Sequence, residues 1–276
     1  MKIMRDAAAV RTAVAGGGRV GLVPTMGAFH EGHLSLIRAA RASCDVVVVW
    51  LFVNPNQFND PSDLVNYPRD EERDAALAAE SGADILFAPT VEAVYPTGFA
   101  TTVTVAGLGD ILEGAHRPGH FTGVATVVAK MLNMVGPHVA FFGAKDAQQV
   151  AVVRRMVADL DIPTRIEVLP IVREPDGLAM SSRNLRLGAD ERRRASVLHR
   201  GLVAARTAAS TGQRDAAALA QVVEDVLAGE AISAEYVAVV DPDTFEPLTT
   251  VDRPALIALA ARVGSVRLID NMEVAP

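Results

Sequence analysis

The sequence of 276 residues contains one cysteine, one tryptophan and no long uninterrupted apolar stretch. The single cysteine, Cys44, excludes a disulfide within the chain and a zinc site built from several thiolates. No apolar run approaches the roughly 20 residues that a membrane-spanning helix needs, so we expect no membrane partner. Residues 1–6 lack a hydrophobic signal segment, and we therefore expect a cytoplasmic protein.

The charge balance also excludes one class of partner. Lysine and arginine number 26 against 33 aspartate and glutamate residues, which gives a formal net charge of −7. Nonspecific binding to nucleic acid is driven mainly by neutralisation of phosphates, so we expect no nucleic-acid partner. Half of the residues are apolar, enough for a sizeable core in one large or two modest domains.

One stretch organises the chain, namely residues 23–33 with the sequence VPTMGAFHEGH. A short apolar run over 19–23 precedes it and predicts a buried strand, and apolar residues at helical spacing over 34–40 follow it. The stretch therefore predicts a strand, a glycine-bearing turn and a helix. Gly27 and Gly32 allow the backbone to approach a ligand, and the start of a helix presents unpaired N–H groups to an anion.

Two histidines, His30 and His33, lie in this stretch three positions apart. On the first turn of a helix they would share a face, where imidazoles can donate hydrogen bonds to phosphate oxygens. For an isolated pair with this spacing, two solvated surface histidines would be the preferred interpretation. Because the strand, the glycines and the helix stand in the right order, we favour phosphate binding.

Strands and helices alternate through the first two thirds of the chain. Apolar runs at 46–53, 84–89, 139–142 and 164–170 predict strands, and residues between them predict helices. The run over 46–53 is apolar on both faces, as is typical of a central parallel strand. A weaker alternation over 101–105 predicts an edge strand. The fold class is therefore α/β, a parallel sheet covered on both faces.

The pattern changes at residue 171, where we place a domain boundary. A loop rich in charge and turn formers follows, then predicted helices over 189–207 and 215–227. Predicted strands over 235–240, 255–263 and 265–269 complete a small sheet. We therefore expect domains at 1–171 and 172–276, the second a smaller α+β domain.

Two further positions are placed for binding. Gln57 follows the strand at 46–53, and ligands of open α/β sheets gather beyond the carboxyl ends of strands. Lys145 stands at the predicted start of a helix, where it could offer a point charge to a phosphate. From these residues alone, a surface ion pair between Lys145 and Asp146 is the preferred interpretation.

The organising stretch resembles the His-x-Gly-His signature of the nucleotidyltransferase superfamily, and specifically the pantoate–β-alanine ligase (pantothenate synthetase) family. Nearly the whole chain takes part in the resemblance. It recurs in order in the blocks FVNPNQF (52–58), YPR (67–69), LEG with RPGHFTGV (112–124), FFGAKD (141–146) and REPDGLAMSSRN (173–184).

The resemblance implies a Rossmann-like catalytic domain over 1–171 that binds ATP and pantoate, with a lid domain over 172–276. It implies ATP-dependent condensation of pantoate with β-alanine through a pantoyl adenylate, with Mg²⁺ and a homodimer. The catalytic residues it implies are His30, His33, Lys145, Ser181, Ser182 and Arg183.

The resemblance also assigns binding residues. It implies ATP contacts at Pro24, Thr25, Met26, Gly27, Ala28, Phe29, His30, Glu31, Gly32, His33, Gly143, Ala144, Lys145, Asp146, Val172, Met180, Ser181, Ser182 and Arg183. It implies substrate contacts at Gln57, Gln149, Arg117, His120 and Tyr67, although a loop salt bridge is an equal interpretation for Arg117. Asp74 is the carboxylate it implies beside Mg²⁺.

The sequence departs from the family pattern at Ala144 and Ala147, which replace an acid and an aromatic residue, and at Arg73, where an acid is common. The departures at Ala144 and Ala147 leave open a regulatory relative that binds ATP without turnover. Another nucleotidyltransferase and an aminoacyl-tRNA synthetase are further alternatives. Pantoate-dependent exchange of pyrophosphate into ATP would separate them.

Overall fold

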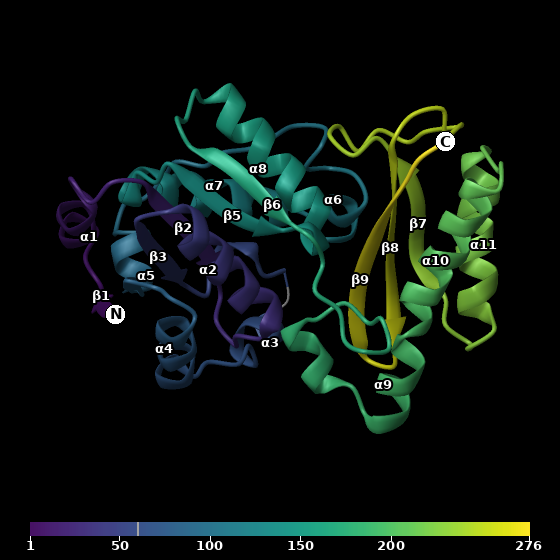
Figure 1. The fold of residues 1–276 in the computed structure, drawn as a ribbon, viewed down its shortest axis with the longest axis horizontal. Coiled ribbons are helices and arrows are strands. Elements are labelled where there is room, and N and C mark those ends of the chain that lie inside the picture. Colours follow the sequence, from purple (N-terminus) through teal and green to yellow (C-terminus); the bar gives the residue numbers. More distant parts are fainter. Residues whose placement is uncertain (60) are drawn as a thin grey trace. The chain divides into compact units, whose positions relative to one another are not determined.

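The computed structural model describes residues 1–59 and 61–276 (Figure 1). Contacts within the chain divide it into two compact units, each with its own sheet and its own apolar core. One unit comprises residues 1–144 and 152–170, and the other comprises residues 145–151 and 171–276. None of the helices in the described ranges combines the length and apolar character needed to cross a membrane.

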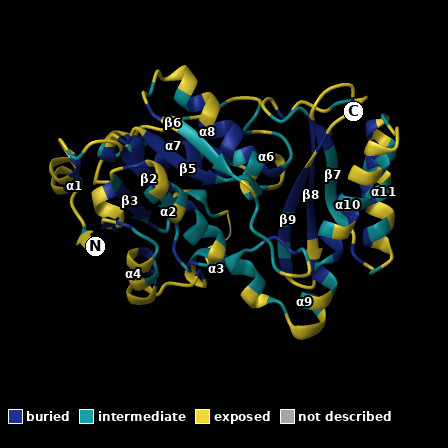
Figure 2. Ribbon diagram, viewed as in Figure 1, coloured by how far each residue is buried: buried dark blue, intermediate teal, exposed yellow. Residues whose placement is uncertain are grey.

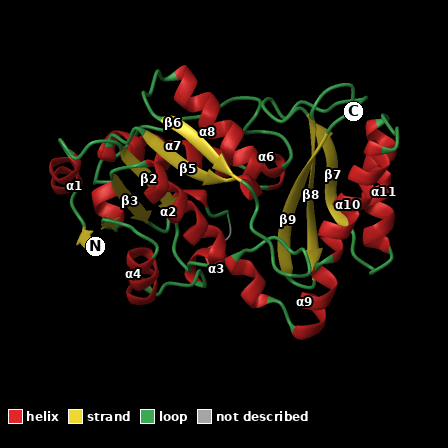
Figure 3. Ribbon diagram, in the orientation of Figure 1, coloured by secondary structure: helices red, strands yellow, loops and turns green. Residues whose placement is uncertain are grey.

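The first unit is built on a six-stranded parallel sheet with the order β1-β4-β3-β2-β5-β6 (Figure 3). Its strands are β1 (Lys2–Met4), β2 (Val20–Thr25), β3 (Val46–Leu51), β4 (Ile85–Phe87), β5 (Val139–Gly143) and β6 (Arg165–Leu169). The predicted parallel α/β sheet is confirmed. β3 lies near its centre, as its continuous apolar run indicates.

Helices surround this sheet. They are α1 (Ala7–Val14), α2 (Glu31–Ser43), α3 (Pro61–Val65), α4 (Glu71–Glu80), α5 (Val91–Val94), α6 (Glu113–His116), α7 (His120–Val135) and α8 (Ala147–Asp159), of which residues 147–151 group with the second unit. α2 packs on β2, β3 and β5, and α1 packs on α7. Alternate residues of β3 point to opposite faces, and Val48 and Val49 are both fully buried, so both faces of the sheet are covered.

Two details of this unit differ from the sequence prediction. No strand forms over 101–105, because the backbone N–H of Val103 donates to Oγ1 of Thr126 (2.9 Å) and not to a neighbouring strand. The edge-strand prediction there is wrong. β1 was not predicted; its three residues are mostly exposed, so they show no burial pattern, and their pairing with β4 makes the strand.

The second unit carries a three-stranded antiparallel sheet in the order β7-β8-β9, with strands Ala234–Val240, Ala255–Val263 and Val266–Val274. Its helices are α9 (Ala189–Ala195), α10 (Val197–Ser210) and α11 (Ala216–Ala228). α10 packs on β8 and β9, and α11 packs on β7. Figure 2 shows β8 and β9 largely buried, and the predicted small sheet is confirmed.

The predicted single helix over 189–207 is two helices in the structure. Ser196 separates α9 from α10 with φ −62° and ψ −16°, and its hydroxyl donates to the carbonyl of Arg193 (3.0 Å). Such bonding of serine to the preceding turn competes with the regular helix ladder. The interruption is local, and apolar spacing continues across it, which explains why the sequence pattern predicts one helix.

Gly123 allows α7 to approach the 3₁₀ turn η1 (Pro55–Gln57) closely. A Cβ atom on Gly123 would lie 2.2 Å from the carbonyl oxygen of Asn56, and Nδ2 of Asn54 donates to the carbonyl of Gly123 (3.1 Å). We expect Gly123→Ala to lower the free energy of unfolding by about 1–3 kcal/mol, because the methyl group forces the two backbones apart. Denaturant unfolding measures this change.

Gly229→Ala is the matched control. An added Cβ there meets its nearest atom at 3.4 Å, and Gly229 has helical backbone angles of φ −59° and ψ −22°. Its stability should stay within about 0.5 kcal/mol of the parent protein, as for substitutions that create no clash. Equal stability of the Gly123→Ala variant and the parent would contradict the close approach.

Candidate active site

The turn between β2 and α2 has an unusual backbone. Gly27 (φ +91°) and Ala28 (φ +52°) both lie in the left-handed region, and Ala28 does so at a steric cost because it has a Cβ. A Cβ on Gly27 would lie 2.9 Å from Oδ2 of Asp74 and 3.1 Å from Cδ1 of Leu51. Position 27 therefore requires glycine for both its conformation and its space.

Asp74 of α4 holds this turn. Its Oδ2 accepts from the N–H of Ala28 (2.7 Å), and its Oδ1 accepts from the N–H of Phe29 (2.8 Å). The side chain is 1% exposed, and this burial raises the pKa of the Asp74 carboxyl, while the two amide donors act in the opposite direction. Arg73 also donates to the carbonyl of Phe29 (3.2 Å), so two neighbouring residues of α4 fix the turn.

The two histidines form a reciprocal cap at the start of α2. Nδ1 of His30 accepts from the N–H of Gly32 (3.2 Å), and Nδ1 of His33 accepts from the N–H of His30 (3.4 Å). Their ring centroids are 4.1 Å apart. A neutral imidazole carries one proton, so a ring whose Nδ1 accepts must carry it on Nε2. Both rings can therefore donate through Nε2 at the N-terminus of a helix.

The cap accounts for Gly32 as well. A Cβ on Gly32 would lie 2.9 Å from Nδ1 and Cε1 of His30, so a larger residue would displace the capping ring. The prediction that the two histidines share the first helical turn is close to the structure: His33 is in that turn, and His30 is the residue before it. Phe29 is buried and its ring lies 5.5 Å from that of His33.

Gln57, Arg117 and His120 come together in the first unit. Nη1 of Arg117 lies 3.1 Å from Nε2 of His120, and Nδ1 of His120 lies 2.8 Å from the carbonyl oxygen of Gln57. Arginine only donates and a carbonyl only accepts, so His120 carries its proton on Nδ1. Nη2 of Arg117 also donates to the carbonyl of Gln57 (3.3 Å). These two side chains fix the backbone of Gln57.

The amide side chain of Gln57 is also held. Its Nε2 lies 3.0 Å from the sulfur of Met26, a weak acceptor, and its Oε1 accepts from Nδ2 of Asn54 (3.0 Å). The contact with Met26 joins η1 to the turn before α2. Tyr67 is buried and packs edge-on against Phe58, the residue after Gln57, with 5.6 Å between ring centroids.

Asn54 is a residue that the sequence analysis did not single out. It is 1% exposed, and its Oδ1 accepts from the hydroxyl of Tyr95 (2.8 Å) in addition to the bonds of Nδ2. Burial raises the pKa of Tyr95 to about 12, so the phenol is a proton donor at neutral pH. The position of Asn54 after β3, at the edge where ligands gather, was a signal that could have identified it.

Most of the remaining candidates belong to the second unit, which begins after Ala144. Ala144–Asp146 form a 3₁₀ turn before α8, and Nζ of Lys145 lies 3.7 Å from Oδ1 of Asp146. Lys145 is mostly buried, with 18% of its side chain exposed. Gln149 lies half-buried in the first turn of α8.

A hairpin brings Val172 beside Met180, whose N–H donates to the carbonyl of Val172 (3.0 Å). Ser181 caps the 3₁₀ turn η3 (Ser182–Arg186) by accepting from the N–H of Arg183 (3.2 Å). Nδ2 of Asn184 donates to the carbonyl of Ala179 (3.1 Å). Oδ1 of Asn184 is buried and has no hydrogen-bond partner within the described ranges, so an acceptor is left beside the serines.

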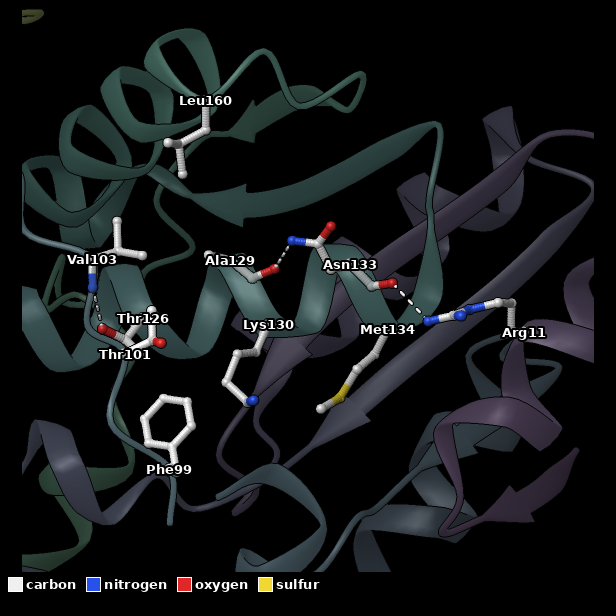
Figure 4. A pocket seen from close by; sticks show the side chains of 10 residues that line it. All are labelled: Arg11, Phe99, Thr101, Val103, Thr126, Ala129, Lys130, Asn133, Met134 and Leu160. Carbon is white, nitrogen blue, oxygen red and sulfur yellow. Dashed lines mark hydrogen bonds between the residues drawn. The ribbon is translucent and has the colours of Figure 1, made fainter. Parts of the chain in front are cut away.

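A separate hollow of about 340 Å³ lies on the first unit, along α7 (Figure 4). Phe99, Ala129 and Met134 supply its apolar lining, and Nζ of Lys130 lies 4.6 Å from the centre of the Phe99 ring. Arg11 reaches its rim by donating to the carbonyl of Asn133 (3.1 Å). None of the predicted site residues lines this hollow.

Comparison with known proteins identifies the family. The sequence profile described as Pantoate-beta-alanine ligase matches residues 2–273. Pantothenate synthetase of Chelativorans sp. (strain BNC1) is 53% identical over 277 residues, covering 99% of this chain and 98% of that protein. Pantothenate synthetase of Cereibacter sphaeroides is 52% identical over 276 residues, covering 99% of each chain.

Solved structures agree with the sequence matches. Pantothenate synthetase from Thermus thermophilus has a TM-score of 0.96 and 47% identity, with both chains fully covered. Pantoate-beta-alanine ligase from Francisella tularensis, in complex with Beta-gamma ATP and Beta-alanine, has a TM-score of 0.82 and 34% identity, covering 99% of this chain and 97% of that one. This chain therefore belongs to the pantoate–β-alanine ligase family.

Proposed function

We propose that this chain condenses (R)-pantoate with β-alanine to pantothenate at the expense of ATP, through a pantoyl adenylate. A carboxylate oxygen of pantoate attacks the α-phosphorus, and the bond to the leaving pyrophosphate breaks. The amine of β-alanine then attacks the acyl carbon, AMP leaves and the nitrogen loses a proton. Family membership supports these substrates, and the solved structure of the Francisella relative is a complex with Beta-gamma ATP and Beta-alanine.

The observation that carries the chemistry is the histidine cap of α2. The first step increases negative charge on the phosphates, so the catalyst needs fixed donors more than a base or a nucleophile. Because Nδ1 of His30 and of His33 accepts a backbone N–H, the Nε2–H groups are the donors of both rings. Such donors need no reorganisation when charge develops on the phosphate.

The remaining ATP contacts follow the predicted assignment. We assign the phosphates to the turn 24–33 and to Lys145, the pyrophosphate leaving group to Met180, Ser181, Ser182 and Arg183, the ribose to Asp146 beside Gly143 and Ala144, and the adenine to Val172. The serine hydroxyls and the guanidinium suit an anionic leaving group. In this proposal the domain 1–171 binds ATP and pantoate, and the domain 172–276 acts as a lid.

Pantoate is assigned to Gln57 and Gln149. An amide carries donors and an acceptor, so it can serve a hydroxyl and a carboxylate without adding charge beside ATP. Arg117 and His120 support this role indirectly, because they fix the backbone of Gln57. Tyr67 supports the same segment through its ring contact with Phe58.

The side chain predicted to bind magnesium, Asp74, is already occupied by protein contacts. Both oxygens of Asp74, the predicted ligand, accept backbone N–H groups, and the side chain is 1% exposed. Across residues 1–59 and 61–276, no three His, Cys, Asp or Glu side chains form a group that could hold a metal. We propose that Asp74 serves the turn and is no metal ligand; Mg²⁺ bound with ATP would supply charge neutralisation at the phosphates.

We propose a homodimer from the family resemblance and a cytoplasmic location from the sequence. A regulatory relative without turnover is the alternative function, motivated by Ala144 and Ala147. Ala144 opens the 3₁₀ turn over Ala144–Asp146 and Ala147 is the first residue of α8, so both stand in regular structure. We therefore propose that the departures are tolerated and that the chain is catalytically active.

The test is pantoate-dependent exchange of labelled pyrophosphate into ATP. We expect exchange by the parent protein, and about 100- to 1,000-fold slower exchange by His33→Ala, the scale for losing one fixed donor. Ser35→Ala, in the same helix, is the control and should exchange normally, because its hydroxyl only donates to the carbonyl of Gly32 (2.9 Å). No exchange by the parent would favour the regulatory alternative, and normal exchange by a folded His33→Ala would refute the role of His33.

Pantoate binding is tested at Gln57. We expect Gln57→Ala to weaken pantoate binding about tenfold or more with ATP binding nearly unchanged, since a site built to bond a hydroxyl loses affinity when a partner is missing. Calorimetric titration with each substrate separately measures both affinities. Gln221→Ala, on the surface of α11, controls for loss of a glutamine. Weaker ATP binding with pantoate binding retained would overturn the assignment.

A further inference from the structure

Two adjacent buried polar residues, Asp270 and Asn271, interrupt the apolar pattern of β9. Asp270 is 3% exposed and Asn271 is 6% exposed. Asp270 alternates with Leu268 and Met272 along β9, so its side chain lies on the same face of the strand as these two residues of the second unit's core. An ionised carboxylate among apolar residues requires a partner, so its position indicates a specific role.

Arg173 is that partner. Its Nη1 and Nη2 donate to Oδ2 and Oδ1 of Asp270 (2.7 and 3.0 Å), a two-pronged geometry that fixes the orientation of both groups. The same guanidinium donates to the carbonyls of Asn271 (3.3 Å) and Gly177 (3.0 Å). Arg173 thus joins the middle of β9 to the segment around Gly177.

This segment leads directly into Ser181, Ser182 and Arg183. Residues 172–180 form a hairpin, in which the N–H of Glu174 donates to the carbonyl of Leu178 (2.8 Å) and Arg173 bridges Ala179. Ser181, Ser182 and Arg183 begin where the hairpin ends. The turn η3, which contains Ser182 and Arg183, itself packs against β9.

Asn271 holds a second segment. Its side chain lies on the face of β9 opposite to Asp270, because successive residues of a strand point to opposite faces. Nδ2 of Asn271 donates to the backbone carbonyl of Lys145 (2.9 Å), 126 positions earlier in the chain. Residues 145–151 group with the second unit, in agreement with this bond.

We propose that Asp270 and Asn271 are positioning residues for phosphate chemistry: through backbone and arginine contacts they fix Lys145 and the Ser181–Arg183 segment relative to each other on one strand. The inference rests on the proposed function, in which both segments contact phosphates. A displacement of about 1 Å at such groups can cost on the order of 100-fold in rate. Neither residue needs to touch a substrate for this effect.

Asn271→Ala tests the proposal because it removes the bond to Lys145 and keeps the Asp270–Arg173 pair. We expect pantoate-dependent ATP–pyrophosphate exchange to fall about 10- to 100-fold, the scale for misplacing a reacting group. Leu268→Val on the same strand is the control. It should lower the melting temperature through lost packing and leave exchange within about twofold, because it keeps the hydrogen bonds of Asp270 and Asn271.

A double-mutant cycle with Lys145→Ala separates positioning from general stability. If Asn271 acts through Lys145, Asn271→Ala should cause little further loss of exchange in a Lys145→Ala background. The proposal would be overturned if the two losses of exchange rate multiplied in the double variant. It would also be overturned if Asn271→Ala exchanged normally while Lys145→Ala exchanged slowly, a result that would leave the proposed function intact. Normal exchange by Lys145→Ala would instead remove the phosphate role on which the inference rests.

Asp270→Asn adds a second readout on the hairpin. It leaves the guanidinium of Arg173, 19% of whose side chain is exposed, without its counter-charge, so we expect a lower free energy of unfolding. The rate at which the Met180 amide hydrogen exchanges with solvent is measured in Asp270→Asn and in Leu268→Val. The comparison is made under conditions in which the two variants have the same free energy of unfolding, so that a difference in rate reflects the hairpin. Faster exchange only in Asp270→Asn supports the anchoring role, and equal rates in the two variants contradict it.

Discussion

The two hydrogen bonds that the carboxylate of Asp74 accepts from the amides of Ala28 and Phe29 are the constraint on which the site depends. They hold a left-handed turn that a chain with a Cβ at position 28 would otherwise avoid. Burial of the carboxylate is costly, as the raised pKa of Asp74 indicates, and the two amides offset part of that cost. The turn directs the chain into the histidine cap, so the geometry of both rings follows from this contact.

Side chains also fix backbone atoms by hydrogen bonds in the second unit and around Gln57. Arg117 and His120 point at the carbonyl of Gln57, and Asn271 points at the carbonyl of Lys145. In each case a side chain satisfies a backbone atom of a residue expected to meet substrate. In the proposed reaction the first step requires precise placement of a few donors, because the protein supplies position and charge and takes no covalent part in it.

Much of the fold could be predicted from sequence because β2, β3, β4 and β5 lie in apolar runs and the helices between them keep a regular period. The misses have local causes. The stretch 101–105 alternates like a strand, but a threonine hydroxyl takes the amide of Val103. Ser196 divides a helix without altering its apolar spacing. Three-residue β1 carries too few residues to form a pattern.

The candidate site could be predicted where residue type or a position at the end of a strand reveals the task. His30 and His33 stand out as donors in a motif and Asn54 follows β3, whereas Asn271 is an asparagine whose partner Lys145 lies far along the chain. Asp74 was predicted as a carboxylate beside magnesium, and the sequence could not indicate that its oxygens face two amides. Tertiary contacts of this kind leave no periodic signal in the sequence.

Backbone amides fix the tautomers of His30 and His33 and leave Nε2–H as the donor of each ring, and the protonation of each ring nitrogen can be measured directly. Nitrogen-15 NMR of the imidazole rings in the parent protein at neutral pH, with His30→Ala and His33→Ala variants to assign the signals, reports which nitrogen carries the proton. The structure predicts a protonated Nε2 and an unprotonated Nδ1 on both rings. A proton on Nδ1 of either ring would contradict the account.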